Sequence, residues 1–322
     1  MSMKKIPVTI VTGFLGAGKT TLVNHQLDAL DKTHTAVIVN EYGEVGVDGA
    51  LIHADDQILL EIRNGCVCCT VRTDLVAGVR SLLQRSPGIE RIIVETSGLA
   101  DPGPVLQSFL AEAELLQQVQ LESVITVVDA VNLARLGEDQ IAQEQIAFSD
   151  LIVMNKMDLV NAPQLEQAYR QIRAINPVAL IIESSRARIA PALAIGQQRF
   201  SLPRALEIEP GLLADEHDHE HDSSIGSCSI QCSEPIEAAA FNRWFNGLVN
   251  TSGEQLMRTK AILQLQGEAR QFHVHSVHML TDARPGKPWP REQSPQSTFI
   301  AIGRGLDHDR LRTGFLACRA MA

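Results

Sequence analysis

Gly13-Phe-Leu-Gly-Ala-Gly-Lys-Thr20 carries the strongest chemical signal in the chain. The spacing G-x-x-x-x-G-K-T is typical of a phosphate-binding loop, whose backbone N–H groups and following helix N-terminus hold a β-phosphate. We expect Lys19 to bridge the β- and γ-phosphates and Thr20 to coordinate Mg²⁺. The residues predicted to bind the nucleotide here are Gly13, Gly16, Ala17, Gly18, Lys19, Thr20 and Thr21.

Asn155-Lys-Met-Asp158 follows a short apolar run and is a candidate base-recognition motif. A carboxylate at Asp158 accepts hydrogen bonds from guanine N1–H and from its 2-amino group. Adenine offers an acceptor at the same place, and an unpaired buried carboxylate discriminates strongly against it. We therefore predict that Asn155, Lys156 and Asp158 select GTP, with GDP as its product, over ATP.

Glu95-Thr-Ser-Gly98 is the third nucleotide motif. Glu95 is expected to hold a magnesium-bound water, and Gly98 to donate its N–H to the γ-phosphate. Position 99 is Leu rather than a water-orienting Gln, so we predict slow GTP hydrolysis without a partner or a bound metal. Lys19, Thr20 and Glu95 are the predicted catalytic residues.

Cys66-Val-Cys-Cys69 is a candidate metal site of a different kind. Cys66 and Cys69 have chelating C-x2-C spacing, and three thiols this close need a further ligand to complete a tetrahedral ion. The alternative is a set of buried, inert cysteines. Thiolate ligands suit Zn²⁺ and also Co²⁺ or Ni²⁺, so the spacing does not name the metal.

Further histidines and cysteines offer weaker signals. The histidines at 217, 219 and 221 alternate with acids and indicate either a metal-collecting tether or a solvated acidic loop. Three histidines fall in a strand pattern, where an ordinary position on the sheet surface is expected rather than a metal site, and two cysteines four apart show no partner. In order, these residues are His217, His219, His221, His273, His275, His278, Cys228 and Cys232.

The elements that would position these motifs are an alternating series of strands and helices in the first two thirds of the chain. Short β-branched runs alternate with amphipathic stretches, which predicts right-handed crossovers and a mostly parallel, doubly wound α/β sheet. The expected strands are 8–11, 36–39, 92–94, 124–128, 151–154 and 178–182, and the expected helices are 20–30, 74–83, 141–148 and 164–175.

The pattern changes after about residue 206. We predict a P-loop GTPase domain over 1–206, a His- and acid-rich linker over 207–227, and a smaller α+β domain over 228–322. Strands are expected at 261–265, 272–277 and 298–302, with a closing helix over 306–319 capped by Asp307. A second helix is indicated by apolar residues at helical spacing: Phe241, Trp244, Phe245, Leu248 and Val249.

The composition of the chain argues against two classes of partner, nucleic acids and membranes. The net charge of the 322 residues is −10 and aromatic residues make up 4%, which argues against a nucleic-acid partner. No apolar run reaches the roughly 20 residues of a membrane span. The basic and apolar start of the chain mimics a signal peptide but contains the phosphate loop, so we expect a cytoplasmic protein with reduced or metal-bound cysteines.

Together the motifs resemble the CobW-like family of P-loop GTPases, which includes proposed zinc chaperones and nitrile hydratase activators. More distantly they resemble the nickel-insertion GTPases of urease and hydrogenase maturation. Tyr42 and Ala261 stand where the family often has Phe and Gly. The matching strings are Gly13-Phe-Leu-Gly-Ala-Gly-Lys-Thr-Thr21, Asn40-Glu-Tyr-Gly-Glu44, Asn64-Gly-Cys-Val-Cys-Cys69, Glu95-Thr-Ser-Gly-Leu-Ala-Asp-Pro102, Asn155-Lys-Met-Asp158, Arg258-Thr-Lys260 and Ser276-Val-His-Met279.

The resemblance implies a metal site coupled to GTP hydrolysis and a second domain that receives a client metalloprotein. It assigns metal binding to Cys66, Cys68 and Cys69, with Glu41 or Glu44 as extra ligands. The leading hypothesis is a GTP-dependent metallochaperone. The alternatives are a regulatory GTPase switch with structural cysteines and, against the guanine motif, a small-molecule kinase.

Overall fold

A computed structural model describes residues 5–30, 34–42, 58–64, 69–133, 139–200, 225–290 and 294–320. The chain divides into two compact units. The first comprises the residues up to 171 together with 179–200, and the second comprises 172–178 and the residues after 200. Each unit has its own sheet and is considered by itself.

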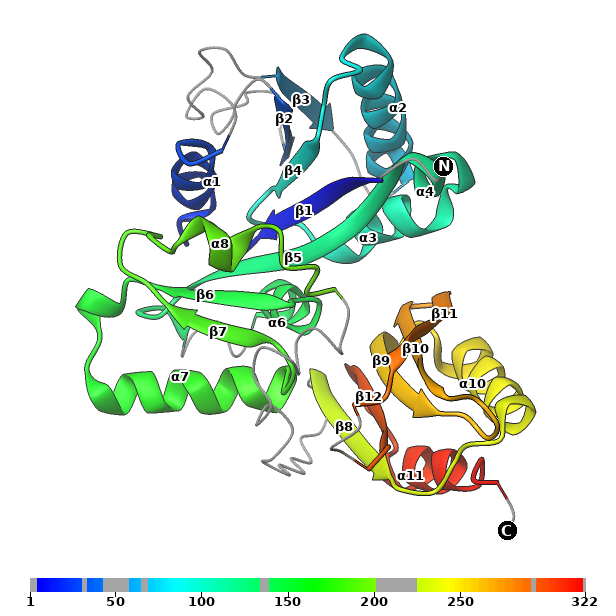
Figure 1. Cartoon of the computed structure of the whole chain (residues 1–322). Helices are drawn as coiled ribbons and strands as arrows, with labels where there is room; N and C mark the ends of the chain where they lie inside the picture. The colour runs from blue at the N-terminus through cyan, green and yellow to red at the C-terminus, as the bar shows by residue number, and fades with distance from the viewer. Residues whose placement is uncertain are drawn as a thin grey trace. The chain divides into compact units, whose positions relative to one another are not determined.

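The first unit is built on a seven-stranded sheet in the order β3-β2-β4-β1-β5-β6-β7, in which every pairing is parallel (Figure 1). The chain builds β2, β3 and β4 on one side of β1 and then β5, β6 and β7 on the other, which confirms the predicted doubly wound α/β fold. The strands are β1 (Ile6–Thr12), β2 (Thr35–Tyr42), β3 (Ile58–Asn64), β4 (Arg91–Thr96), β5 (Val119–Asp129), β6 (Leu151–Asn155) and β7 (Leu180–Glu183).

Helices cover both faces of this sheet. Ile125 and Val127 of β5 pack in one core cluster with α1 and α8, whereas the Thr126 hydroxyl between them donates to a carbonyl of α6 on the opposite face. On that second face α3 contacts α2 and α6. The helices are α1 (Lys19–Leu27), α2 (Cys69–Arg85), α3 (Pro102–Ala111), α4 (Ala113–Gln118), α6 (Gln140–Ala147), the 3-10 turn η3 (Met157–Leu159), α7 (Ala162–Ile175) and α8 (Pro191–Ala194).

Several of these elements were not expected from the sequence, among them β3, α3, α4 and the short α8 and η3. The strand β3 lies at the edge of the sheet and carries Glu61 and Arg63, so it lacks the continuous apolar run of a central strand. The helix α3 contains Gly103 and two prolines, which conceal its periodicity, but the Asp101 side chain caps it by accepting from the Gly103 N–H at 2.7 Å. The short α4 follows it directly.

The second unit has a five-stranded antiparallel sheet in the order β11-β10-β9-β12-β8, with two helices packed on one face (Figure 1). This arrangement confirms the predicted α+β class. Its elements are β8 (Ile225–Cys232), α10 (Ala238–Ser252), β9 (Leu256–Gln264), β10 (Arg270–Val277), β11 (Leu280–Pro288), β12 (Ser297–Arg304) and α11 (His308–Leu316).

The core of this unit lies between the sheet and the two helices. The apolar side of α10 contributes Phe241 and Phe245, which lie against Phe299 and Phe315 from β12 and α11. Asp307 accepts from the Arg310 N–H at 2.9 Å and caps α11 as expected. The edge strands β8 and β11 were not predicted, because β8 is rich in small polar residues and β11 contains two prolines and a glycine.

Most of the predicted linker over 207–227 lies outside the described residues, including His217, His219 and His221. Its last three positions belong to β8, which begins at Ile225. The exact domain boundaries therefore stay predictions. Within the described parts of the chain, no helix combines the length and apolar character that crossing a membrane requires.

Candidate nucleotide site

The nucleotide motifs meet at one edge of the parallel sheet. The strands β4, β1, β5 and β6 are consecutive neighbours, and their carboxyl ends lead to Glu95, Gly13, Asp129 and Asn155. Glu95 pairs with Val11 just before the phosphate loop, and Asp129 pairs with Asn155. Segments up to about 140 residues apart in sequence thus form one site, at the place where open α/β sheets bind ligands.

The glycines of the loop between β1 and α1 are required by its conformation. Gly13, Gly16 and Gly18 have φ values of 138°, 72° and 111°, which side chains rarely allow. A Cβ on Gly13 would lie 2.2 Å from the Val127 carbonyl oxygen, and one on Gly18 would lie 2.6 Å from the Asn155 amide nitrogen. The loop therefore packs closely on β5 and β6, and its conformation agrees with the predicted P-loop.

Lys19 and Thr20 begin α1 and turn toward the site. The Lys19 ammonium donates to the Phe14 carbonyl at 3.2 Å, so it lies across its own loop. The Thr20 hydroxyl donates to Glu95 Oε1 at 2.6 Å, and the Glu95 carboxylate is 1% exposed. A hydroxyl and a carboxylate in contact provide the oxygen ligands that Mg²⁺ prefers, so these residues fit the ion.

Asn155 connects three parts of the site. Its Nδ2 donates to the Ala17 carbonyl at 2.8 Å, and its Oδ1 accepts from the Ala187 N–H at 2.7 Å. The P-loop, the end of β6 and the loop after β7 are thereby joined through one buried amide. Asn155 thus holds these three segments together, which the motif alone did not specify.

Lys156 adopts a left-handed backbone, with φ 63°, and its ammonium binds the Asp129 carboxylate at 2.6 Å. Asn132 Nδ2 and the Val131 N–H also donate to Asp129. Burial alone would raise the pKa of Asp129, but the hydrogen bonds from Lys156, Asn132 and Val131 hold it below the ordinary 3.8. Asp129 therefore binds Lys156, the second residue of the N-K-x-D motif.

Asp158 is exposed at the start of the following 3-10 turn, on the surface next to Lys156. In the loop after β7, Ser184 donates its N–H to the Met154 carbonyl at 2.8 Å, and its own carbonyl accepts from the Met157 N–H at 3.1 Å. The Ser184 N–H thus extends the strand pairing, and the Ser184 carbonyl supports the turn that carries Asp158.

The loop after β4 contains Gly98 and lies against the P-loop. A Cβ on Gly98 would lie 2.8 Å from the Leu15 backbone nitrogen. Leu15 and Leu99 are large apolar residues that are 55% and 46% exposed. From the other side, Gln145 of α6 donates to the Gly98 carbonyl at 3.3 Å. Gly98 is thus held close to the loop that it is predicted to assist.

The predicted metal ligands are only partly covered by the structure. Cys66, Cys68 and Glu44 lie outside the described residues. Glu41 is near the end of β2, and Cys69 is the first residue of α2, but their side chains are not described. Among the side chains that are described, no cluster of three or more metal-binding groups occurs.

The histidines of β10 and the cysteines of β8 in the second unit are buried. His273 and His275 lie on β10 but are buried rather than on the expected sheet surface, and His278 lies in the turn that follows. Burial lowers the pKa of His273 to about 4, and burial lowers that of His275 well below 6.5, with Lys260 adding to the effect. Cys228 and Cys232 are buried in the core beneath the helices, where burial raises the pKa of the Cys232 thiol.

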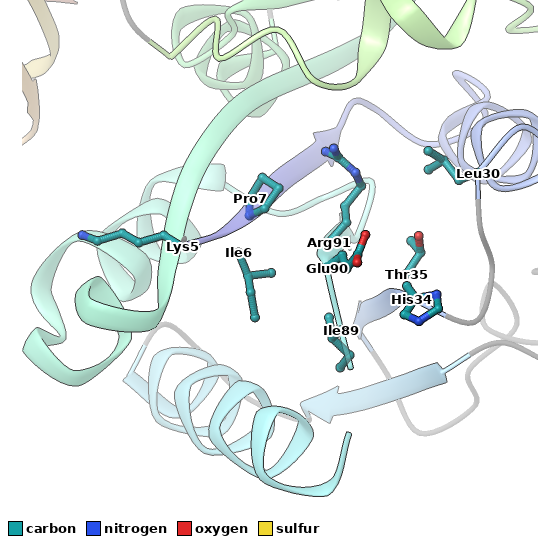
Figure 2. Close-up of a pocket in the computed structure, with 9 residues that line it drawn as sticks. All are labelled: Lys5, Ile6, Pro7, Leu30, His34, Thr35, Ile89, Glu90 and Arg91. Atoms are coloured by element: carbon teal, nitrogen blue, oxygen red, sulfur yellow. The ribbon is translucent and has the colours of Figure 1, made fainter. Parts of the chain in front are cut away.

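A cavity of about 440 Å³ opens at the opposite edge of the parallel sheet, near the amino ends of β1, β2 and β4 (Figure 2). The Arg91 guanidinium on its wall is paired with Glu122 at 2.5 Å, and Thr9 also donates to Glu122. The cavity is therefore separate from the nucleotide motifs. It is lined by Lys5, Ile6, Pro7, Leu30, His34, Thr35, Ile89, Glu90 and Arg91.

With this geometry established, comparison with known proteins identifies both units. Residues 7–183 match the CobW/HypB/UreG nucleotide-binding domain, and residues 225–319 match the cobalamin synthesis protein CobW C-terminal domain. The chain belongs to the CobW family. This membership confirms the predicted resemblance and, with the intact P-loop and N-K-x-D motifs, makes the chain a P-loop GTPase that uses GTP and Mg²⁺.

Individual relatives extend over both units of this CobW-family protein. The zinc chaperone YjiA of Escherichia coli K12 is 32% identical, over 98% of this chain and 100% of its own length. The zinc chaperone CobW of Pseudomonas aeruginosa is 30% identical, over 97% and 92%. The crystal structure of Zn(II)-bound YjiA GTPase from E. coli superposes with a TM-score of 0.75 at 26% identity, over 99% of this chain and all of that one.

Two residues of this family member were missed from its sequence. Asp129 carried a weak signal, because an acid at the end of a buried strand occupies the edge where ligands bind. Gln145 carried only the signal of a polar residue within the buried side of a helix. Neither follows a short motif, so their contacts came from the fold.

Proposed function

We propose that this protein is a cytoplasmic metallochaperone that couples GTP hydrolysis to the binding and delivery of Zn²⁺, or of a similar ion such as Co²⁺ or Ni²⁺. The metal is cargo, and the recipient is a client metalloprotein. The main support comes from the residues at the carboxyl end of β4 and of its neighbour β2. Glu95 of β4 meets Thr20 of the P-loop, and the adjacent β2 ends near Glu41. The zinc chaperones among the relatives support the same function.

The nucleotide half of the proposal assigns a role to each residue at the sheet edge. Lys19 and the loop N–H groups hold the phosphates, and Gly98 contacts the γ-phosphate. Thr20 and Glu95 hold Mg²⁺, which would neutralise charge on the β- and γ-phosphates. Asp158 recognises the guanine edge. The buried Thr20–Glu95 contact at 2.6 Å is the strongest support, since it joins the two magnesium groups without any rearrangement.

The metal half assigns the cargo to Cys66, Cys68 and Cys69, with Glu41 or Glu44 completing the site. Cys66 and Cys68 lie in the segment between β3 and α2, and Cys69 is the first residue of α2. The strands β3 and β2 are parallel to β4, so β3 ends at the same edge of the sheet as Glu95. Ligands at this edge can respond to the loss of the γ-phosphate.

Coupling between the two halves follows from linkage. If one nucleotide state holds the metal more tightly, hydrolysis changes the metal affinity, and the metal must change the nucleotide affinity by the same factor. Metal binding also needs thiolates, so the affinity should fall as the pH is lowered. A GTPase whose cysteines were only structural would show neither effect and would act as a regulatory switch.

The test is to measure Zn²⁺ affinity in the presence of a non-hydrolysable GTP analogue and of GDP. A difference of about fivefold or more would support the coupling, in the usual range of allosteric free energies. A Cys66→Ser and Cys68→Ser double variant should lose stoichiometric Zn²⁺, whereas Cys228→Ser should retain it. Equal metal affinities in the two nucleotide states, or full metal retention by the double variant, would refute the proposal.

A further inference from the structure

Gln145 is a buried polar residue on the side of α6 that faces the sheet. Its side-chain nitrogen donates to the Gly98 carbonyl at 3.3 Å and to the Ala100 carbonyl at 3.2 Å. Both partners are carbonyl oxygens, so the amide must present its NH₂ group to them. The residue is 1% exposed, where an amide without such partners would cost free energy. Gln145 therefore clamps both ends of the Leu99 segment.

The backbone of Gln145 is itself fixed by two hydroxyls. Thr126 Oγ1 donates to the Gln145 carbonyl at 2.8 Å, and Ser149 Oγ, also 2.8 Å from that carbonyl oxygen, donates its one proton either to it or to Thr126 Oγ1. Thr126 lies on β5, three residues before Asp129. The anchor thus rests on the central part of the sheet and has little freedom to follow a moving loop.

Gly98 is confined from the opposite side as well. The P-loop residue Leu15 lies so close that a Cβ on Gly98 would approach the Leu15 nitrogen, Cα and Cδ2 at 2.7 to 2.9 Å. Gly98 consequently lies between the P-loop and Gln145. Its backbone position relative to the phosphate loop is set by these two contacts.

We infer that Gln145 is a positioning residue for the γ-phosphate: it holds the loop after β4 so that the Gly98 backbone is ready to meet a triphosphate. The inference rests on the proposed role of Gly98 in the nucleotide site. Because the loop is ordered in advance, binding of the γ-phosphate need not order it. GDP has no γ-phosphate, so its affinity should not depend on Gln145.

The experiment uses the full chain and compares the affinities of a non-hydrolysable GTP analogue and of GDP by fluorescence titration with Mg²⁺ and without Zn²⁺. Gln145→Met keeps an unbranched side chain of similar size and removes both donors. We expect analogue affinity and the rate of GTP hydrolysis to fall about tenfold, the value of one or two buried hydrogen bonds, while GDP affinity stays within about twofold.

Two further variants make the test specific. Thr126→Val keeps the shape of the side chain but loses one hydroxyl that holds the anchor, and it should shift the ratio in the same direction by a smaller factor. Gln140→Leu removes an exposed glutamine at the start of α6 and should leave the ratio unchanged. If Gln145→Met fails to fold, as seen by thermal melting, Thr126→Val still decides the question.

The outcomes separate this inference from the proposed function. An equal loss of analogue and GDP affinity in the Gln145 and Thr126 variants would mean that the network only stabilises the fold, and the inference would be wrong. An unchanged ratio would overturn it too. Failure of the wild-type protein to bind either guanine nucleotide would instead refute the assignment of the nucleotide site.

Discussion

The two sheets of this protein gather their polar residues in different ways. In the parallel sheet the central strands β1, β4, β5 and β6 are mostly buried, and polar groups lie at their carboxyl ends, where Glu95, Asp129 and Asn155 are found. In the antiparallel sheet the polar groups lie along the strands instead. Lys260 and His275 are directly opposite each other on β9 and β10, and the alternate residues Ala261 and Val274 face the helices.

This difference reflects strand geometry. Parallel strands are connected by crossovers, so their ends share one edge and can join motifs that are distant in sequence. Antiparallel strands expose alternate residues on one face and assign the others to the core. A change in the first unit should therefore act on nucleotide chemistry, whereas a change on the polar face of the second should act mainly on the stability of that unit.

The largest expected effect comes from Lys19→Ala. Removing the ammonium from the phosphate loop should lower the rate of GTP hydrolysis by about a hundredfold or more, because preorganised charge at the transferred phosphate is lost. Phosphate release with saturating GTP measures this effect. Lys5→Ala is a matched control, since Lys5 lies at the other edge of the sheet (Figure 2). Equal losses of GTP hydrolysis in the two variants would show that hydrolysis does not depend specifically on the carboxyl edge of the sheet.

Asp158→Ala should have the next largest effect. We propose that the carboxylate binds the guanine N1–H and 2-amino group, so its loss should weaken GTP binding by about a hundredfold and abolish the preference over ATP. Competition titrations with GTP, ITP and ATP give the affinities. The exposed Glu166→Ala on α7 serves as the control. Retained discrimination between GTP and ATP in the Asp158 variant would contradict the assignment.

Acid should destabilise the second unit through its histidines. Burial lowers the pKa of His273 to about 4 and lowers the pKa of His275 well below 6.5. The unfolded chain then binds more protons below about pH 6.5, so the stabilisation is present above that pH and is lost as the pH falls toward 4. We expect a loss of about 1–3 kcal/mol.

Thermal melts between pH 7 and pH 4 would measure this loss, with His273→Gln and His275→Gln flattening the profile. The groups that face the pair across the strands are Lys260, Asp282 and Arg284, and Arg258 adds positive charge. A pH profile that the two variants leave unchanged would place the acid sensitivity elsewhere.

Asp129→Asn should give the smallest of these effects. It replaces the ion pair to Lys156 by a weaker contact and should reduce guanine-nucleotide affinity by about five- to tenfold, corresponding to about 1 kcal/mol for a partly exposed pair. Because the pKa of Asp129 is lowered, its contribution is present above 3.8 and is lost only below that pH. GDP titrations at pH 7 measure the loss, and an unchanged affinity would reduce Asp129 to a turn cap.

Much of the first unit could be predicted from local patterns. The six expected strands and four expected helices were found, because buried parallel strands have continuous β-branched runs and the helices have a clear apolar period. The elements that were missed have weak local signals. Polar edge strands such as β3 and β11 are recognised by their pairing, and α3 begins with a cap and prolines rather than an apolar stripe.

The sequence by itself determined the types of chemistry and their order along the chain: a phosphate loop, an acid after a strand, a guanine motif and a cysteine cluster. Backbone N–H groups in a glycine loop and a carboxylate against guanine act through local geometry, which a short motif specifies. Family membership confirmed the GTPase, while the assignments of single residues and the cysteine site stay predictions.

The tertiary structure alone decided which side chains serve these motifs. Asp129 reaches Lys156 because β5 and β6 are neighbours, and Gln145 reaches Gly98 because α6 packs on the same face as the loop after β4. Such contacts join residues 27 and 47 positions apart. No local propensity encodes them, because they depend on the order of strands in the sheet and on the face that each helix covers.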